Sequence, residues 1–352
     1  MKLLGILLVF VALALGVAFA APKSTPKPSA SATPTGYHVA ERYAVGGEGG
    51  WDILTLDPAS HRLYYGRGTR AQVFDTESGK VVGEVADTPG IHAVGLVPEL
   101  GRGFTTNGRD SSITVFDTKT LKTLARIRLD AKGADAIVYE PVSKRVFAFN
   151  GGSDNAVAID PAAMQVVGTV ALGGRPEFPA VDGKGTVYVN LEDSSVVVAF
   201  DAAKLQVLRR WSIAPGEEPS GLAIDRDHHL LFSACSNKTM VVSDGEAGKV
   251  VATVPIGERP DGAEFDAAKM LAFSSNGDGT LTVVHEDAPD SFRVVANVET
   301  QRGARTMALD PTSHRIWLAS ASFGEPPAPT EEHPHPRPPM VPNSFVILRV
   351  DP

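Results

Sequence analysis

Seven residues able to do chemistry recur along the chain at spacings of 40 to 44 residues. They are Asp52, His92, Asp135, Glu177, Ser220, Asp261 and Arg305. We call them the funnel residues, because the repeat described below predicts that they surround one axis. Four carboxylates, an imidazole and a guanidinium at equivalent positions are not what packing alone selects. Like charges about 7 Å apart repel by roughly 2 kcal/mol at an effective dielectric constant near 20, so a cation, raised pKa values or Arg305 must relieve them.

One chemistry that fits these residues is catalysis. His92 would be the general base, oriented by Asp52 or Asp135. Arg305 would hold a substrate carboxylate. A hard divalent cation such as Ca²⁺ prefers oxygen ligands, and the candidate ligands are Asp52, Asp135, Glu177 and Asp261. Such an enzyme would be a metal-assisted hydrolase of lactonase type or a lyase.

The other chemistry is binding without reaction, of a small polar or anionic ligand or of a protein partner. The candidate ligand contacts are Trp51, Arg67, Arg109, Arg305, Asn107, Asn150 and Asn276. Arg67 and Arg109 suit an anionic group, whereas an Asn that recurs at strand ends is better explained as a cap of the backbone. The sequence contains no Gly-x-Ser-x-Gly, His-x-x-x-His or phosphate-binding glycine motif, which favours binding over catalysis.

The elements that position these residues are short strands. Residues 219–259 contain four apolar runs of five or six residues, rich in β-branched side chains and separated by polar turns, which predicts four strands. The same unit occurs seven times. Units of about 40 residues with four strands are propeller blades, so we predict an all-β, seven-bladed β-propeller over residues 37–352 with four antiparallel strands per blade.

The two ends of the chain predict how the ring closes. The seventh unit stops at Asp351 after its third strand, Ser344 to Val350, and a spare strand lies at residues 40–45. We predict that Ala40 to Val45 completes the last blade and removes its open edge.

The second strands Phe104-Thr-Thr-Asn107 and Phe273-Ser-Ser-Asn276 and the fourth strand Lys249-Val-Val-Ala-Thr-Val254 resemble the YVTN repeat. Over residues 37–350 the chain resembles the YncE-like family of exported bacterial seven-bladed propellers. Arg67, Cys235 and Ser320 depart from the Asn position of that repeat. The resemblance implies the fold and export; it implies no shared reaction.

Other polar residues are explained by turns. His61, His228, His229 and His314 fall in equivalent turns, and Asp75, Asp117, Asp160, Asp201 and Asp244 end third strands, so we expect structural roles for both sets. The seventh unit inserts a proline-rich loop, residues 321–343, which is predicted to be stiff and to lie across or beside the mouth of the funnel. His333 and His335 in this loop are alternative metal ligands.

The N-terminus predicts export to the periplasm or the exterior. Residues 1–20 read as a signal peptide ending in Ala18-Phe-Ala20, and residues 21–36 as a Pro/Ser/Thr linker. A retained membrane anchor is the alternative, because the apolar run approaches a spanning length. Residues 37–352 carry 30 basic and 41 acidic residues, a net charge of −11, which opposes binding to nucleic acid or anionic lipid. The single cysteine, Cys235, excludes an intramolecular disulfide.

These observations predict an exported propeller that binds a small polar ligand or a protein partner at its funnel, with the hydrolase or lyase as the alternative. A third hypothesis is an envelope interaction module that uses an outer strand, for which residues 205–211 are the candidate.

Overall fold

The computed structural model describes residues 36–328 and 338–352, which lie within one compact unit. The predicted signal peptide, the predicted linker except for Gly36, and both His333 and His335 lie outside these residues. No helix in the described part of the chain is long and apolar enough to cross a membrane.

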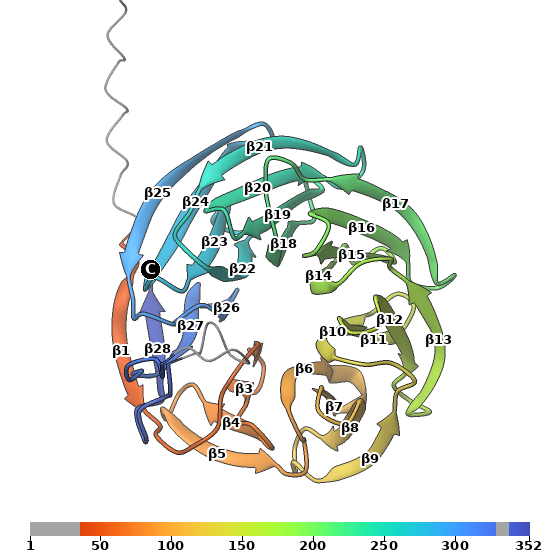
Figure 1. Ribbon diagram of the computed structural model, residues 1–352, viewed down its shortest axis with the longest axis vertical. Coiled ribbons are helices and arrows are strands. Elements are labelled where there is room, and N and C mark those ends of the chain that lie inside the picture. Colours follow the sequence, from red (N-terminus) through yellow and green to blue (C-terminus); the bar gives the residue numbers. More distant parts are fainter. Residues whose placement is uncertain (1–35, 329–337) are drawn as a thin grey trace, which may run out of the picture. The chain divides into compact units, whose positions relative to one another are not determined.

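Seven four-stranded antiparallel sheets stand around a common axis, which confirms the predicted β-propeller (Figure 1). The first four blades have the following strands, from the axis outward. Blade one has β2 (Leu54–Asp57), β3 (Arg62–Gly66), β4 (Ala71–Asp75) and β5 (Lys80–Val85). Blade two has β6 (Ile91–Val97), β7 (Arg102–Asn107), β8 (Ser112–Asp117) and β9 (Thr123–Arg128), with a 3₁₀ turn η1 (Pro98–Leu100). Blade three has β10 (Ala134–Glu140), β11 (Arg145–Asn150), β12 (Asn155–Asp160) and β13 (Gln165–Ala171). Blade four has β14 (Pro176–Val181), β15 (Thr186–Leu191), β16 (Val196–Asp201) and β17 (Gln206–Ser212).

The remaining three blades follow the same plan. Blade five has β18 (Pro219–Asp225), β19 (Leu230–Cys235), β20 (Thr239–Asp244) and β21 (Lys249–Pro255). Blade six has β22 (Pro260–Asp266), β23 (Leu271–Asn276), β24 (Thr280–Ala288) and β25 (Ser291–Glu299). Blade seven has β26 (Met307–Asp310), β27 (Arg315–Ser320), β28 (Val346–Asp351) and, outermost, β1 (His38–Ala44).

The pairing of β1 with β28 confirms the predicted closure of blade seven by the N-terminal strand. Tyr43 lies opposite Ile347, and Ala44 lies opposite Val346. The strand spans residues 38–44, two residues earlier than the predicted start, with a bulge between Val39 and Glu41. The first and last strands of the chain therefore share one sheet.

The hydrophobic core lies between the blades. Each of the seven apolar clusters joins the facing sides of two neighbouring blades, as Phe147 of blade three and Phe200 of blade four illustrate. Middle strands such as β7 and β19 are buried along nearly their whole length, whereas an outer strand such as β17 is mostly exposed. Each fully buried phenylalanine contributes about 2–3 kcal/mol of hydrophobic free energy, so packing between blades holds the ring together.

The turn chemistry predicted from the sequence is present. The carboxylates that end third strands accept backbone N–H groups two or three residues ahead, as when Asp117 accepts the amide of Thr120 at 2.7 Å. His61, His229 and His314 occupy the left-handed position of their turns, with φ of 57°, 57° and 60°. The backbones of these three histidines therefore have the structural role expected of them. His228 lies one position before His229 and does not have a left-handed backbone.

The two described ends of the proline-rich insertion pair with each other. Phe323 forms an isolated bridge with Met340, and the Gly324 amide donates to the carbonyl of Pro339 at 2.9 Å. The ring of Phe323 lies 6.1 Å from that of Trp51, between their centroids. The base of the insertion therefore packs beside blade one; the predicted lid over the mouth depends on residues 329–337, outside the described part.

Candidate functional site

The first strands of the blades are bulged at the positions where the funnel residues stand. The register of β6 with β7 shifts between Ile91 and Val94, around His92. Equivalent shifts in blades three to six enclose Asp135, Glu177, Ser220 and Asp261. A bulge leaves a residue out of the ladder and redirects its side chain, which here frees side chains beside the axis. Asp52 and Arg305 lie in the segments that precede β2 and β26.

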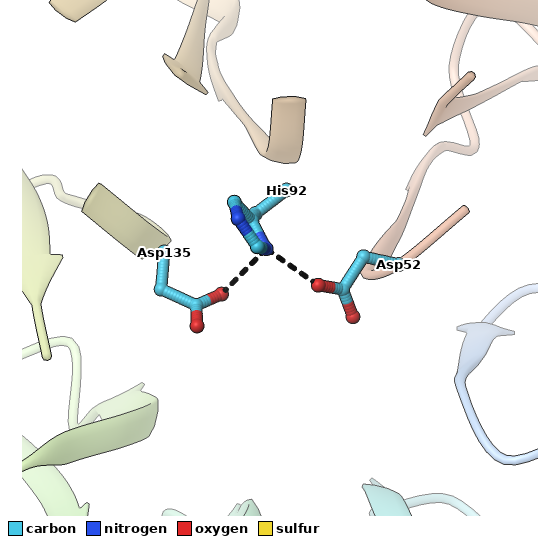
Figure 2. A group of neighbouring side chains, drawn as sticks. All are labelled: Asp52, His92 and Asp135. Atoms are coloured by element: carbon cyan, nitrogen blue, oxygen red, sulfur yellow. Dashed lines mark hydrogen bonds and ion pairs between the residues drawn. The ribbon is translucent and has the colours of Figure 1, made fainter. Parts of the chain in front are cut away.

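Asp52, His92 and Asp135 form the first group of the site (Figure 2). His92 Nδ1 lies 2.7 Å from Asp52 Oδ2 and 3.5 Å from Asp135 Oδ1. Figure 2 shows the two carboxylates approaching the same nitrogen from opposite sides. The hydrogen bond to Asp52 raises the pKa of His92 above its usual value, while burial, reinforced by Asp52, raises the pKa of Asp135 to about 6.

This arrangement leaves the other imidazole nitrogen without a hydrogen-bond partner among the described residues. A neutral His92 that donates its Nδ1 proton to Asp52 keeps a lone pair on Nε2, which is the orientation of a general base. Gly108 makes room for this edge of the ring, because a Cβ at that position would lie 2.8 Å from Nε2. The side chain of His92 is 37% exposed, so a small molecule in the funnel can reach it.

A second group joins Ser220, Asp261 and Arg305. Ser220 Oγ donates to Asp261 Oδ1 at 2.6 Å, and Arg305 Nη1 lies 3.1 Å from Asp261 Oδ2. Burial raises the pKa of Asp261 to about 6, and the positive charge of Arg305 opposes that rise. The charge of Asp52 acts on both Asp135 and Asp261, which shows that the two groups share one electrostatic environment.

Glu177 belongs to a third group, with a partner that the sequence reasoning missed. Arg175 Nη2 lies 3.4 Å from Glu177 Oε1, and Arg175 Nη1 lies 2.8 Å from Glu192 Oε2. Burial, with the charge of Asp135 second, raises the pKa of Glu177 to about 8. A signal was present in the sequence: Arg175-Pro-Glu177 in blade four and Arg259-Pro-Asp261 in blade six share one pattern before the first strand.

The structure places the funnel residues in three neighbouring groups, and the four carboxylates named as candidate cation ligands are divided among these groups. Among the described residues, the funnel group close enough to share a metal ion is Asp52, His92 and Asp135. Glu177 and Asp261 are each engaged by an arginine instead. One imidazole nitrogen and two carboxylates suit a transition metal better than Ca²⁺, which takes oxygen ligands.

The three asparagines predicted as ligand contacts lie inside the blades. Asn107, Asn150 and Asn276 are all completely buried. Asn107 Nδ2 donates to Ser112 Oγ at 3.1 Å and to Thr114 Oγ1 at 3.0 Å, so its amide ties β7 to β8. Burial and these internal hydrogen bonds place the asparagine side chains out of reach of a ligand in the funnel. The predicted backbone contact is present at Asn150, whose Nδ2 donates to the carbonyl of Ala148 at 3.0 Å, whereas Asn107 donates to side-chain hydroxyls.

Arg67 also packs internally. Its side chain is 1% exposed, its guanidinium carbon lies 3.9 Å from the centre of the Phe345 ring, and Nη2 donates to the carbonyl of Gly46 at 3.0 Å. Burial lowers its pKa to about 10. Trp51 is half-buried against the same Phe345 ring, at 5.1 Å between centroids. Arg109 is exposed and, of the arginines predicted from the loops, is the one that a ligand can reach.

Beyond the funnel residues, the side chains that surround the axis are mainly apolar. A cavity of about 550 Å³ is lined by the inner strands, including Ile137, Phe178, Ile224 and Phe265. It extends toward the turns that follow the first strands, on the face opposite the funnel. Glu264 lines this apolar space, and burial raises its pKa to about 7. The polar funnel site and this mainly apolar cavity thus follow one another along the axis of the propeller.

Comparison with known proteins establishes the architecture. No protein-family model matches the chain, and no curated protein matches its sequence. Among solved structures, a chain in the crystal structure of a mitotic checkpoint complex has a TM-score of 0.69 at 13% identity, covering 98% of this chain and 100% of that one. The chain is a β-propeller.

Two further structures share this fold. A chain of Kuenenia stuttgartiensis hydrazine synthase gives a TM-score of 0.65 at 17% identity, covering 85% of this propeller and 96% of that chain. The structure of U3-55K gives 0.72 at 8% identity, covering 90% and 99%. Identities this low show a shared fold and carry no information about the reaction or ligand.

Proposed function

We propose that this chain is an exported β-propeller that binds a small polar ligand at its funnel. The observation that carries the proposal is the convergence of three polar groups, centred on His92, Glu177 and Asp261, at the bulges of β6, β14 and β22. Bulged strands of a closed ring hold such side chains rigidly, which lowers the entropic cost of binding. Support for export comes from the signal-peptide pattern of residues 1–20 and from the resemblance to YncE-like proteins.

The chemistry of the site specifies the ligand class. Carboxylates outnumber the cationic groups around the axis, so the ligand must offer hydrogen-bond donors such as hydroxyl or amino groups. Arg305 is 47% exposed while bonded to Asp261, and it can also receive an acidic group. Sugar acids, hydroxy acids and amino sugars have this combination. A peptide segment of a protein partner would have to present the same groups.

A thermal-shift screen of the purified protein against hydroxy acids, sugar acids and amino sugars tests the proposal, because a ligand of the native state raises the melting temperature. Affinities of the hits are then measured for Asp52→Asn and Asp261→Asn, with His61→Gln as the control. His61 lies in a turn on the opposite face, half-exposed and 3.7 Å from Glu77. We expect at least a tenfold loss for the funnel variants and none for the control. The proposal is contradicted if no compound raises the melting temperature, or if the compounds that do so bind both funnel variants as tightly as the wild type.

A hydrolase or lyase that uses His92 is the second candidate, favoured by the 2.7 Å contact between His92 Nδ1 and Asp52. In this reaction Nε2 would take a proton from water or substrate, and Asp52 would stabilise the imidazolium that forms. A general base is active in its neutral form. Because the hydrogen bond to Asp52 raises the pKa of His92, turnover should increase with pH, with a midpoint above the usual pKa of histidine. Lactone hydrolysis that is lost in His92→Gln but retained in His61→Gln would support catalysis, and hydrolysis unaffected by His92→Gln would exclude it.

A further inference from the structure

A second cluster of titratable side chains lies between blades five and six, on the face opposite the funnel. Asp225 ends β18, His228 lies in the following turn, and Glu286 lies near the end of β24. His228 Nδ1 is 2.7 Å from Glu286 Oε1 and 2.8 Å from Asp225 Oδ2. The side chains of Asp225 and Glu286 are 2% and 0% exposed, whereas that of His228 is 39% exposed. We call these three residues the seam cluster.

The seam cluster has more negative charge than its neighbours can balance. One imidazole nitrogen carries a single proton, so it cannot donate to both carboxylates at once. Asp225 Oδ2 and Glu286 Oε2 are buried, and neither accepts a well-directed hydrogen bond from the described residues, although Asp225 Oδ2 lies 2.8 Å from His228 Nδ1. No described lysine or arginine forms an ion pair with either carboxylate. The other oxygen of each carboxylate is engaged: Asp225 Oδ1 accepts the Asp227 amide at 2.9 Å, and Glu286 Oε1 faces His228. Two buried carboxylate oxygens without partners are costly, and either a proton shared by the two acids or a bound cation removes that cost.

The neighbouring seam, between blades six and seven, contains a balanced pair with a different construction, because His314 occupies the turn position of His229 and its partner acid belongs to the preceding blade. There His314 Nδ1 lies 2.7 Å from Asp266 Oδ2, so one imidazole faces one carboxylate. The additional acid in the seam cluster comes from blade six. In blade five Leu230 lies opposite Asp244, but in blade six Leu271 lies opposite His285, and β24 continues through Glu286 to Ala288. Blade six thus replaces the turn-capping aspartate and adds a buried glutamate.

We propose that Asp225, His228 and Glu286 bind a divalent first-row transition metal ion, with Zn²⁺ as the representative. One ligand atom from each residue lies within 4.8 Å of the other two. Ligands about 2.1 Å from a tetrahedral zinc ion are roughly 3.4 Å apart, so small side-chain rotations would open the present contacts enough to admit the ion. The imidazole nitrogen disfavours Ca²⁺ and Mg²⁺, which take oxygen ligands.

The surroundings favour an open coordination position rather than a closed structural site. Three protein ligands leave a fourth position of a tetrahedral ion for water or another small ligand. The partial exposure of His228 gives solvent access to the cluster. Asp225 also lines the apolar cavity, so the ion would lie at the rim of the 550 Å³ space. A molecule in that cavity could therefore contact the ion, independently of the funnel.

Zinc titration of the chelator-treated full chain tests the proposal, with a chromophoric chelator as competitor. We expect one zinc ion at the seam cluster, bound with an affinity that falls at least tenfold in Glu286→Gln and in His228→Gln, whereas any zinc bound at the funnel group would be lost only in His92→Gln. The matched control is His314→Gln, which removes the imidazole of the balanced seam, and it should leave the affinity unchanged. His92→Gln should also leave it unchanged, which separates this site from the funnel group. Co²⁺ should give visible absorption bands that disappear in Glu286→Gln.

Folding is checked separately, because Glu286 is buried and His228 contacts two buried carboxylates. Metal-free Glu286→Gln should melt no lower than the metal-free wild type, since it removes one of two buried carboxylates. The proposal is overturned if no stoichiometric zinc binds. It is also overturned if zinc binds equally well to folded Glu286→Gln and His228→Gln, or if His92→Gln abolishes the site while those two variants retain it.

Discussion

Glu177 combines burial with nearby negative charge, which brings the titration of its carboxyl group into the range around neutral pH. Its pKa is raised to about 8 from an ordinary value of 4.5, first by burial and then by Asp135. At neutral pH a protonated Glu177 is a hydrogen-bond donor, a role that an ionised carboxylate cannot have. The residue can therefore present either a donor or an acceptor to a ligand, depending on pH.

The raised pKa predicts a pH-dependent gain of stability in Glu177→Gln. Between about pH 4.5 and 8 the folded protein binds more protons than the unfolded chain at this residue, so its contribution to stability is full below pH 4.5 and is lost as pH rises to 8. Glutamine does not titrate. Denaturant unfolding should therefore show the variant more stable by up to about 5 kcal/mol at pH 9, with little difference at pH 4.5. Exposed Glu77→Gln is the control, and a gap that does not widen with pH would contradict the expectation.

At the residue scale, the repeat predicted which side chains meet but not how they pair. Equal spacing placed Asp52, His92 and Asp135 together because equivalent positions of a ring face one axis. Whether His92 bonds to Asp52 or Asp135 depends on atomic positions inside a bulge, which spacing does not encode. The seam cluster was missed for a related reason: the position of His228 in a recurrent turn explains its backbone, while its imidazole contacts a glutamate 58 residues away in the next blade.

Arg67 joins three elements at the seam between blades one and seven. It follows β3, its guanidinium covers Phe345 just before β28, and it donates to the connection between β1 and β2. Nε and Nη1 are buried, and neither has a hydrogen-bond partner among the described residues, so the charge is poorly compensated. Its packing area therefore matters more to this seam than its charge.

This geometry predicts opposite outcomes for two substitutions of Arg67. Arg67→Met keeps the long side chain over Phe345 and removes a buried charge, so unfolding free energy should change by less than about 1 kcal/mol or should increase. Arg67→Ala leaves a cavity and should lose about 3 kcal/mol. Chemical denaturation of both variants measures this. A loss of about 3 kcal/mol in Arg67→Met as well would mean that the charge itself is required, as for a bound anion.

At the element scale, strand number and turn chemistry were predictable because they are local. Apolar runs of fixed length and aspartates at strand ends determine a strand and its turn within a few residues. The bulges of the first strands were not predicted, because a bulge is a mismatch between two strands and neither strand shows it alone. The burial of Asn107 and Arg67 likewise depends on contacts between elements.

The closed ring follows from one pairing at the scale of the whole molecule. Six blades are each made from one continuous stretch of chain, while blade seven joins β1 to three C-terminal strands (Figure 1). The sequence predicted this closure because the last repeat lacks a strand and the first is preceded by one. Tyr37, just before β1, is buried, packs edge-on against Phe273 of blade six at 5.3 Å and donates to the carbonyl of His314. The N-terminal segment thus also bridges two blades.

Removal of residues 1–45 should therefore destabilise the whole ring, not only blade seven. Without β1, the outer edge of β28 loses its hydrogen-bond partner, and Tyr43 no longer packs on Phe74 and Trp317. An unpaired, apolar strand edge is a site of association between chains. We expect a lower melting temperature, a broader transition and oligomers by size-exclusion chromatography. A chain lacking only residues 1–35 is the control and should behave as the full-length protein does. If the two truncated chains melt alike and both remain monomeric, closure by β1 does not stabilise the ring, and blade packing alone must do so.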